Sequence, residues 1–350
     1  MTETASVPVG TPSSDTPVLS VRNLVKHFPV RGRGLLRRRV GEIHAVCDVS
    51  FDIHSRETLG LVGESGCGKS TTARTLLNLV PATAGEVRYQ DTEITALSRK
   101  EIQHLRREMQ IVFQDPYASL DPRIPVNEIV AEPLRIHGLY DNGGKDRVRD
   151  LLATVGLRPE HGNRFPHEFS GGQRQRIGVA RALALEPRLL VLDEPVSALD
   201  VSIQAGVLNL LKDLQADLGL SYLFVSHDLS VVRHVADRIA VMYLGKIVES
   251  APADELFENP AHPYTQALMS AIPIPDPHKE RSRQRVVITG DVPSPANPPS
   301  GCRFRTRCPK FADQLTDGQR SRCIEETPEL VDRGHGHPSA CHYAETMVLL

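Results

Sequence analysis

The residues best placed to do chemistry lie in the stretch Gly63-Glu64-Ser65-Gly66-Cys67-Gly68-Lys69-Ser70, which Thr71 follows. Its G-x-x-x-x-G-K-S pattern is typical of a phosphate-binding loop, because the glycines let successive backbone N–H groups turn toward an anion. Lys69 could then reach the β- and γ-phosphates of a nucleotide, and the Ser70 hydroxyl could ligate Mg²⁺. The stretch predicts a nucleotide site without saying what the nucleotide is used for.

A second set of candidate residues follows an apolar run from Leu189 to Leu192. Asp193 ends this run, and a buried strand that ends in a carboxylate can hold Mg²⁺ beside a phosphate loop. Glu194, the next residue, would lie near the γ-phosphate and could polarise an attacking water. The two acids together predict hydrolysis of the bound nucleotide.

A third candidate segment is Ser170-Gly171-Gly172-Gln173. Ser170 can cap a following helix, and the two glycines permit close backbone approach to an anion. Such a sequence is common in loops, but its place shortly before the Leu189–Leu192 run makes the signal stronger. We interpret it as a further anion-contacting segment.

The elements that must position these residues alternate between strands and helices. Residues 57–62 predict a buried strand that leads into the phosphate loop, and residues 71–79 have helical apolar spacing. Other runs that predict strands are residues 18–24, 46–53, 85–89, 110–113, 188–192, 222–226 and 239–243. Helical character is expected at 99–107 and over most of 115–169. This alternation predicts an α/β fold with a wound, largely parallel sheet.

The bulk composition suits a soluble globular protein with a sizeable core. Of the 350 residues, 40% are hydrophobic and 24% are charged, and a net charge of −2 argues against a whole-surface nucleic-acid binder. No apolar run approaches the roughly 18 residues needed to span a bilayer. The N-terminus lacks a basic and apolar secretory signal, so we expect a cytosolic protein whose six cysteines form no structural disulfides.

The two ends of the chain differ in amino-acid composition from its middle. Residues 1–17 are rich in Thr, Ser and Pro and predict a disordered tail. The arginines within residues 31–39 form a basic insert. It could be a solvated extension of a hairpin, or a patch that binds anionic lipid or nucleic acid. We favour the hairpin, because no aromatic residues interleave the arginines. Prolines between 273 and 299 indicate an extended connector, so we place a domain boundary near 260–275.

The order of the motifs GESGCGKS, VFQDP, FSGGQRQR, LLVLDEP, SALD and SHD resembles the nucleotide-binding subunits of ATP-binding-cassette (ABC) transporters. The resemblance covers about residues 18–260 and implies a P-loop NTPase fold, in which a RecA-like wound sheet carries an antiparallel β subdomain and a helical subdomain at about 115–172. It also implies ATP and Mg²⁺ as cofactors. In that family two cassettes pack head to tail, so each ATP lies between one subunit's phosphate loop and the other's signature motif.

Carried over residue by residue, the resemblance makes Gly63 to Thr71 the Walker A loop and Asp193 with Glu194 the Walker B pair. The signature, Ser170 to Gln173, would contact the ATP of the partner, and it begins with Phe169 where Leu is usual. Further roles are implied for single residues and one loop: Gln114 as the lever glutamine that senses Mg²⁺, Ser197-Ala198-Leu199-Asp200 as the D-loop, His227 as the switch histidine, and Phe28 as the residue that stacks on adenine. Catalysis would then rest on Lys69, Gln114, Glu194 and His227.

Four cysteines follow the connector, Cys302, Cys308, Cys323 and Cys341, with the spacing C-x5-C-x14-C-x17-C. Thiolates suit Zn²⁺ or an iron–sulfur cluster, and the absence of tight C-x2-C pairs argues against an ordinary zinc ribbon. With residues 262–268 and 293–295, this small irregular region, about 261–350, resembles the C-terminal extension of oligopeptide/dipeptide and nickel importer ATPases. In that subfamily such cysteines can hold a 4Fe–4S cluster. We favour the cluster over Zn²⁺, although the third cysteine is farther from the second than in many relatives.

The two remaining cysteines and one nearby histidine carry less information. Cys67 lies inside the phosphate loop, and we expect a tolerated small residue rather than a redox switch. Cys47 lies in a predicted strand and is expected in the core. His27, beside Phe28, gives no functional signal by itself.

The resemblance implies the ATPase subunit of a peptide importer, of the F-type that pairs with a D-type subunit. Its partners would be that second ABC ATPase subunit, two transmembrane permeases and an extracytoplasmic solute-binding protein, with no nucleic acid, at the cytoplasmic face of the membrane. The alternative is a soluble ABC-type ATPase that acts on nucleic acid or ribosomes. Such proteins usually carry tandem cassettes or a coiled-coil insertion, and this sequence has neither. A third hypothesis, compatible with the first, makes the cysteine region a redox sensor.

Overall fold

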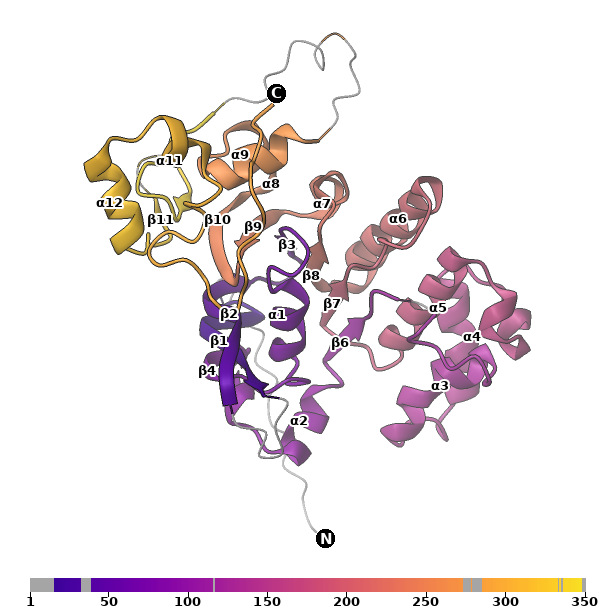
Figure 1. Cartoon of the computed structure of the whole chain (residues 1–350). Helices are drawn as coiled ribbons and strands as arrows, with labels where there is room; N and C mark the ends of the chain where they lie inside the picture. The colour runs from indigo at the N-terminus through magenta and orange to yellow at the C-terminus, as the bar shows by residue number, and fades with distance from the viewer. Residues whose placement is uncertain are drawn as a thin grey trace.

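The computed structural model describes residues 16–32, 39–115, 117–272, 278, 285–332, 334 and 336–347. Most of the predicted disordered tail and the tip of the basic insert lie outside these ranges. The described chain consists of two sheets, a group of helices and a C-terminal region that packs on the larger sheet (Figure 1). The α/β class predicted from the alternation of strands and helices is confirmed.

The larger sheet carries the catalytic candidates. Its strands follow the order β11-β12-β10-β9-β3-β8-β7-β6, and β9, β3, β8, β7 and β6 run parallel. The bounds of these parallel strands are Arg238–Tyr243 for β9, Thr58–Val62 for β3, Ser221–Ser226 for β8, Leu189–Asp193 for β7 and Met109–Val112 for β6. Every residue of β3, β7 and β8 is buried, as expected for parallel strands covered on both faces. Their carboxyl ends meet at one edge, where the phosphate loop begins.

The smaller, antiparallel sheet has the order β2-β1-β4-β5. Its strands are β1 (Leu19–Arg31), β2 (Arg39–Ile53), β4 (Ala84–Tyr89) and β5 (Thr92–Glu93). Strands β1 and β2 pair out to Arg31 and Arg39, the two ends of the predicted basic insert, and residues 33–38 between them lie outside the described residues. One apolar core joins this sheet to helix α1 (Lys69–Leu76) and to one face of the larger sheet.

The remaining helices pack on the larger sheet or on one another. Their bounds are α2 (Arg99–Leu105), α3 (Val126–Ile136), α4 (Gly144–Thr154), α5 (Gly171–Leu183), α6 (Val201–Leu218) and α7 (Leu229–Val235), with short 3₁₀ turns at Ile94–Ala96, Pro159–Asn163 and Pro166–Glu168. Helices α3, α4 and α5 pack together on the side of the molecule away from the antiparallel sheet (Figure 1). Phe169, at the start of the signature, is buried in the core that they share.

The C-terminal region is continuous with the larger sheet. It follows β10 (Lys246–Pro252) and α8 (Ala253–Glu258). It contains α9 (Pro263–Ser270), α11 (Pro309–Asp313), α12 (Asp317–Glu325), β11 (Val331–Asp332) and β12 (Pro338–Ser339). Strand β12 pairs with β10, and the Ala340 N–H donates to the Val248 carbonyl at 2.7 Å. The carboxylate of Glu249, buried in β10, contacts Nε2 of the equally buried His337 at 2.8 Å. This region therefore supplies partners to groups buried inside the sheet.

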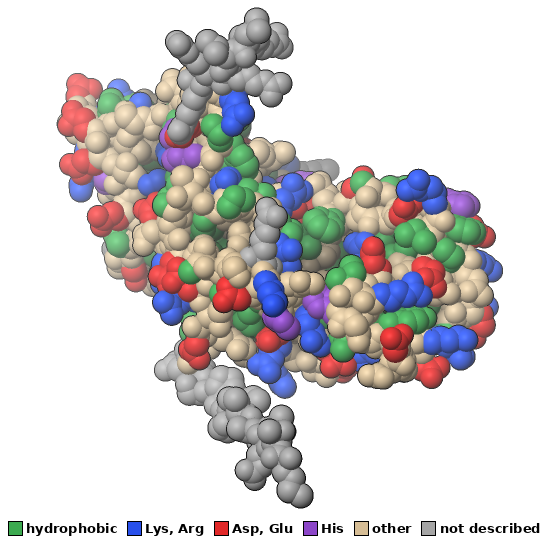
Figure 2. All heavy atoms as spheres, turned by 90° about the horizontal axis from the view of Figure 1, so that it is seen from below, with side chains coloured by type: hydrophobic (Ala, Val, Ile, Leu, Met, Phe, Trp, Pro, Cys, Tyr) green, Lys and Arg blue, Asp and Glu red, His purple; other side chains and the backbone are tan. Residues whose placement is uncertain are grey.

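The surface mixes charges of both signs. On the face shown in Figure 2, acidic and basic side chains lie interspersed and form no continuous patch of one sign. Within the part of the chain that the structure describes, no helix has the length and apolar character needed to cross a bilayer.

Candidate functional site

A pocket of about 760 Å³ opens at the carboxyl edge of the larger sheet. It brings together residues from both sheets, the phosphate loop and the C-terminal region. The lining consists of Phe28, Ile43, Ala45, Glu64, Ser65, Gly66, Gly68, Lys69, Ser70, Thr71, Gln114, Glu194, His227 and Pro295. Most of the nucleotide-binding residues predicted from the sequence therefore share one pocket, whereas Gly63, Cys67 and Asp193 lie beneath its surface.

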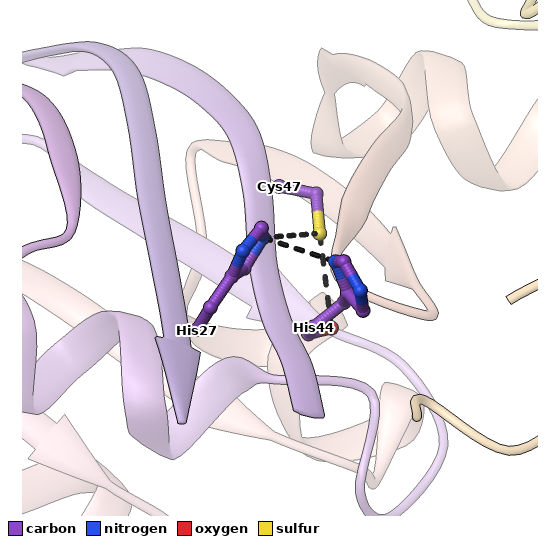
Figure 3. Close-up of side chains that lie close together, drawn as sticks. All are labelled: His27, His44 and Cys47. Carbon is purple, nitrogen blue, oxygen red and sulfur yellow. Dashed lines mark hydrogen bonds between the residues drawn. The ribbon is translucent and has the colours of Figure 1, made fainter. Parts of the chain in front are cut away.

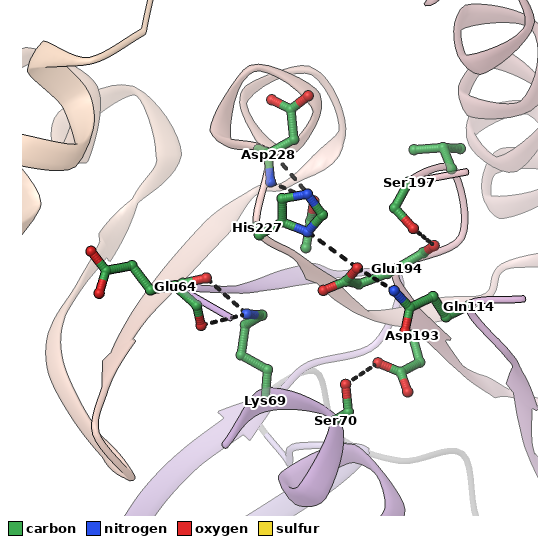
Figure 4. A network of polar contacts seen from close by, with 12 residues as sticks. Glu64, Lys69, Ser70, Gln114, Asp193, Glu194, Ser197, His227 and Asp228 are labelled. Atoms are coloured by element: carbon green, nitrogen blue, oxygen red, sulfur yellow. Dashed lines mark hydrogen bonds and ion pairs between the residues drawn. The ribbon is translucent and has the colours of Figure 1, made fainter. Parts of the chain in front are cut away.

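The phosphate loop is held by close contact with neighbouring strands. Gly63 and Gly68 have φ angles of 151° and 113°, a region that favours glycine. A Cβ at Gly63 would lie 2.1 Å from the Met242 carbonyl oxygen, and one at Gly68 would lie 2.2 Å from that of Ala45. The Lys69 ammonium donates to the loop's own Gly63 carbonyl at 2.7 Å (Figure 4). Close packing thus fixes the backbone of the loop, and the Lys69 ammonium lies against it.

Asp193 and Ser70 place two oxygen atoms, possible ligands for a metal ion, side by side beneath the loop. The Ser70 hydroxyl donates to Asp193 Oδ1 at 2.7 Å, and burial raises the pKa of the Asp193 carboxyl (Figure 4). Among the described residues, Asp193 Oδ2 has no hydrogen-bond partner, and the guanidinium of Arg74 lies 3.7 Å from it. A buried carboxylate oxygen with unused capacity beside a hydroxyl is a donor set that suits Mg²⁺.

Glu194 lies between two side chains that orient it. Gln114 Nε2 donates to Glu194 Oε2 at 2.8 Å, and His227 Nδ1 lies 3.1 Å from the same oxygen (Figure 4). The backbone of Glu194 has a φ of 50°, which costs energy in a residue other than glycine and is typical of functional sites. Ser197 of the predicted D-loop holds this turn by donating to the Glu194 carbonyl at 3.1 Å. The arrangement leaves a nine-tenths buried carboxylate facing the pocket, where it can accept a proton from water.

The predicted signature residues lie apart from this pocket. Ser170 caps α5, because its hydroxyl accepts from the Gln173 N–H at 3.4 Å and the Gln173 side chain accepts from the Ser170 N–H at 3.0 Å. Gly172 packs so closely that a Cβ there would lie 2.3 Å from Ile203 Cγ2 of α6. The lining of the pocket, within the described residues, includes none of residues 170–173 or 197–200. These segments are therefore available to a site other than this chain's own pocket.

Sequence reasoning missed the contacts that the C-terminal region makes with the phosphate loop. Arg307 donates to both carboxylate oxygens of Glu64, at 2.8 and 3.1 Å, and the Glu64 N–H donates to the Tyr264 hydroxyl at 3.0 Å. Pro295 lines the pocket, and its carbonyl accepts from the His44 N–H at 2.9 Å. No local sequence pattern predicts these contacts, because Arg307 is 243 residues from Glu64 in the chain.

The four C-terminal cysteines also come together. They line one small cavity of about 20 Å³, along with His262, Pro263, Phe304, Arg305, Lys310, Phe311, Leu315, His342 and Tyr343. The Cys302 N–H donates to the Cys323 carbonyl at 2.8 Å, which brings two of the segments together. Burial raises the pKa of the Cys302 and Cys341 thiols to about 12, so without a cation these thiols stay protonated at neutral pH. Four thiols on one cavity are a donor set that fits an iron–sulfur cluster or Zn²⁺.

Comparisons with known proteins agree with this geometry. A family model described as ABC transporter matches residues 46–197, and one described as oligopeptide/dipeptide transporter, C-terminal region, matches residues 248–314. The chain is 49% identical over 334 residues to the oligopeptide transport ATP-binding protein AppF of Bacillus subtilis, covering 95% of this chain and 99% of that protein.

Solved structures of cassettes are similar in fold. CbiO1 of Clostridium perfringens, part of the ABC transporter complex cbiONQ, superposes with a TM-score of 0.60 at 27% identity, covering 69% of this chain and 91% of that chain. The dimeric, post-hydrolysis structure of the ATP-binding cassette MJ0796 with ADP and Pi has a TM-score of 0.59 at 29% identity, covering 67% of this chain and 98% of that chain. This chain belongs to the ABC transporter family, in the branch that carries the oligopeptide/dipeptide transporter C-terminal region.

Proposed function

We propose that this chain is the ATP-hydrolysing subunit that powers import of di- and oligopeptides by an ABC transporter. The observation that carries the proposal is the 49% identity, over nearly the full length of both chains, to an oligopeptide transport ATP-binding protein. The pocket supports the ATPase part, because it combines a predicted phosphate loop with the largely buried carboxylate of Glu194. Both the cassette and the C-terminal region are matched, so the similarity is not confined to the nucleotide site.

In the proposed mechanism this chain's residues position and stabilise charge. Lys69 and the backbone N–H groups of the loop bind the phosphates, and Phe28, on the pocket wall, stacks on the adenine. Ser70 and Asp193, with Gln114 nearby, would hold Mg²⁺, and the ion would supply positive charge at the phosphate oxygens. Glu194 orients the attacking water and accepts its proton, while Gln114 and His227 fix the rotamer of Glu194.

The proposed catalytic unit contains two cassettes. Ser170 to Gln173 and the loop at Ser197 to Asp200 stay outside this chain's own pocket, and we assign them to the ATP of a second cassette. ATP binding then closes the pair and hydrolysis releases it, which couples the chemistry to transport. The dimer of the related cassette MJ0796 supports this assembly.

The remaining partners follow from the importer proposal. They are a D-type ATPase subunit, two transmembrane permeases and an extracytoplasmic solute-binding protein, with this chain bound at the cytoplasmic face of the membrane. We also keep the division of the chain at about residue 260 as a proposal, with the cassette before it and the cysteine region after it.

For the four C-terminal cysteines we propose a 4Fe–4S cluster, with Zn²⁺ as the alternative. Sulfur atoms in a tetrahedral zinc site lie about 3.8 Å apart, given bonds of about 2.3 Å. Among the described residues, no three of these cysteines have sulfur atoms that all lie within 4.8 Å of one another. The cavity between these thiols is about 20 Å³, so binding of either group would require the cysteine segments to move apart or rearrange.

Peptide uptake tests the proposed function. A strain that lacks this chain should fail to take up a labelled oligopeptide, and the wild-type chain should restore uptake while Glu194→Gln should not. Normal uptake in the deletion strain would contradict the importer proposal, as would co-purification of the chain with ribosomes instead of permeases.

A further inference from the structure

A cluster of possible metal ligands lies beside the nucleotide pocket, in the antiparallel sheet. His27 of β1 and His44 and Cys47 of β2 each offer one atom, and these three atoms lie within 4.8 Å of one another (Figure 3). His27 Nε2 is 3.2 Å from His44 Nδ1 and 3.7 Å from the Cys47 sulfur. Neither the ATPase mechanism nor the C-terminal cysteines use these residues.

An irregularity in strand pairing brings the three side chains together. Residues three apart on a regular strand point to opposite faces, so His44 and Cys47 would normally be separated. The pairing of β1 with β2 shifts between Lys26 and His27, where Val46 and His44 are the respective partners. Such a bulge lets both β2 side chains face His27. The register shift therefore accounts for the approach of the three residues.

The distances match those of a tetrahedral zinc site. Bonds of about 2.0–2.1 Å to nitrogen and 2.3 Å to sulfur place two nitrogens about 3.4 Å apart and a nitrogen and a sulfur about 3.6 Å apart. The corresponding distances here are 3.2 and 3.7 Å. The third pair, the ligand atoms of His44 and Cys47, lies within 4.8 Å, so side-chain rotation would bring all three ligands onto one ion.

The surroundings also suit a metal ligand set. Glu42 Oε2 lies 3.5 Å from Nδ1 of His27, the ring nitrogen opposite the clustered one, and a carboxylate in that place orients a metal-binding imidazole. The His27 side chain is about one-fifth exposed, at 21%, so an ion can enter from solvent.

We propose that His27, His44 and Cys47 bind a Zn²⁺-class divalent ion, with the fourth position open to water. Two imidazoles and a thiolate are ligands that Zn²⁺ prefers, whereas Mg²⁺ prefers oxygen. Binding releases the proton of the Cys47 thiol to solvent and converts it to the ligating thiolate. The site is thus chemically separate from the Mg²⁺ ligands of the ATPase.

The position of this site links it to the nucleotide pocket. Phe28 adjoins His27 in β1, and Ile43 and Ala45 flank His44 in β2; all three residues line the pocket. The backbone continues the link, because the Cys47 N–H donates to the Gly245 carbonyl and the Gly245 N–H donates to the Cys67 carbonyl, both at 2.8 Å. An ion here would fix β1 to β2 along the pocket wall.

Zinc binding to the full-length chain tests the proposal. Metal-free wild-type protein, titrated with Zn²⁺ against a chromophoric chelator, should bind one equivalent more than His44→Ala or Cys47→Ser. The matched control is His54→Ala, which removes an exposed histidine just after β2 and should bind as wild type does. A Cys302→Ser/Cys323→Ser variant should keep the equivalent, because it leaves the cluster in β1 and β2 intact.

Anomalous diffraction from zinc-soaked wild-type crystals locates the ion without any substitution. A peak between His27, His44 and Cys47 is the expected result, and its absence at saturating zinc would overturn the proposal. Equal zinc stoichiometry in the wild type, His44→Ala and Cys47→Ser would overturn it as well. Loss of the equivalent only in the Cys302→Ser/Cys323→Ser variant would assign the zinc to the C-terminal region instead.

Discussion

The guanidinium of Arg307, in the C-terminal region, holds both carboxylate oxygens of Glu64, in the phosphate loop, at 2.8 and 3.1 Å. The Arg307 side chain is only 9% exposed, so solvent screens this contact weakly. Arg307 also directly precedes Cys308, one of the four clustered cysteines. The cysteine region is therefore in direct contact with the predicted phosphate-binding loop.

Arg307→Ala should loosen the phosphate loop. Hydrogen bonds to charged groups contribute about 1.5–3 kcal/mol, so we expect the free energy of unfolding to fall by about that amount and the KM for ATP to rise. Chemical denaturation and steady-state ATPase assays measure the two effects. Arg322→Ala is the control, because it removes an exposed arginine that pairs with Glu326 on α12, and it should cost less than about 0.5 kcal/mol. Equal effects of the two substitutions would show that the contact with Glu64 contributes no more to stability or to the KM for ATP than an exposed ion pair does.

Glu194→Gln should bind ATP but hydrolyse it slowly. Loss of the proton acceptor should reduce steady-state turnover roughly 10²–10⁴-fold, while Gln114 and His227 still line the pocket. The ATP-bound cassettes should then accumulate as a closed dimer, which light scattering detects. Glu160→Gln changes an exposed acid far from the pocket and should behave as the wild type. Undiminished hydrolysis by Glu194→Gln would show that its assigned role is wrong.

Gly172→Ala should strain the contact between α5 and α6. The new Cβ would lie 2.3 Å from Ile203 Cγ2, and overpacking of this kind costs about 1–3 kcal/mol. Adding Ile203→Ala should recover part of this stability, and thermal unfolding of the four proteins in the cycle measures the coupling. Gly178→Ala, in the same helix, meets nothing within 4 Å and should be neutral or stabilising. Additive effects of the two substitutions would contradict the steric explanation.

Replacing clustered cysteines should remove the metal group of the C-terminal region. Anaerobically purified wild-type protein should show the broad visible absorption of an iron–sulfur cluster, and Cys302→Ser/Cys323→Ser should lose it. Cys47→Ser lies outside this group and should keep the absorption. Colourless wild-type protein that contains stoichiometric zinc at these cysteines would decide for Zn²⁺.

Acid should weaken the attachment of α9 through His262. Burial lowers the pKa of His262 to about 4, and its Nδ1 accepts from the Tyr264 N–H at 3.0 Å at the start of the helix. The unfolded chain takes up this proton near its ordinary pKa of about 6.5, so stability is retained above that pH and falls as pH drops toward 4.

His262→Asn gives the matching experiment. Asparagine can still cap α9 but does not titrate, so the variant should lose this part of the pH dependence of unfolding between about 6.5 and 4. Denaturation at a series of pH values measures it, with His54→Asn as an exposed control. An unchanged slope in His262→Asn would rule out His262 as the source.

The sequence was sufficient for the parts of the site that depend on local pattern. The loop ending at Ser70 follows a strand and opens a helix, and Asp193 ends a buried strand, so their meeting at one sheet edge follows from the topology of parallel strands. Gln114 and His227 were placed by the order of the motifs, and the structure brings both to Glu194.

Contacts that depend on tertiary packing could not be predicted. His27 gave no signal in sequence and Cys47 was expected only as a core residue, because the pairing shift that joins them to His44 has no signature in residue types. Arg307 was one of several arginines near the cysteines, and nothing local distinguishes the one that reaches Glu64. Pairing irregularities and long-range ion pairs are set by how whole elements pack.

The buried Glu249 makes the cassette dependent on the C-terminal region for hydrogen-bond partners. Its carboxylate lies inside the larger sheet, yet its partners are the His337 ring and the backbone N–H groups of Ala261 and His262, all from the C-terminal region. A cassette cut off near residue 260 would keep the charge and lose what neutralises it, and β10 would become an open edge prone to aggregation. Removal of the C-terminal region would therefore leave a buried carboxylate without its partners and an unpaired strand at the same place.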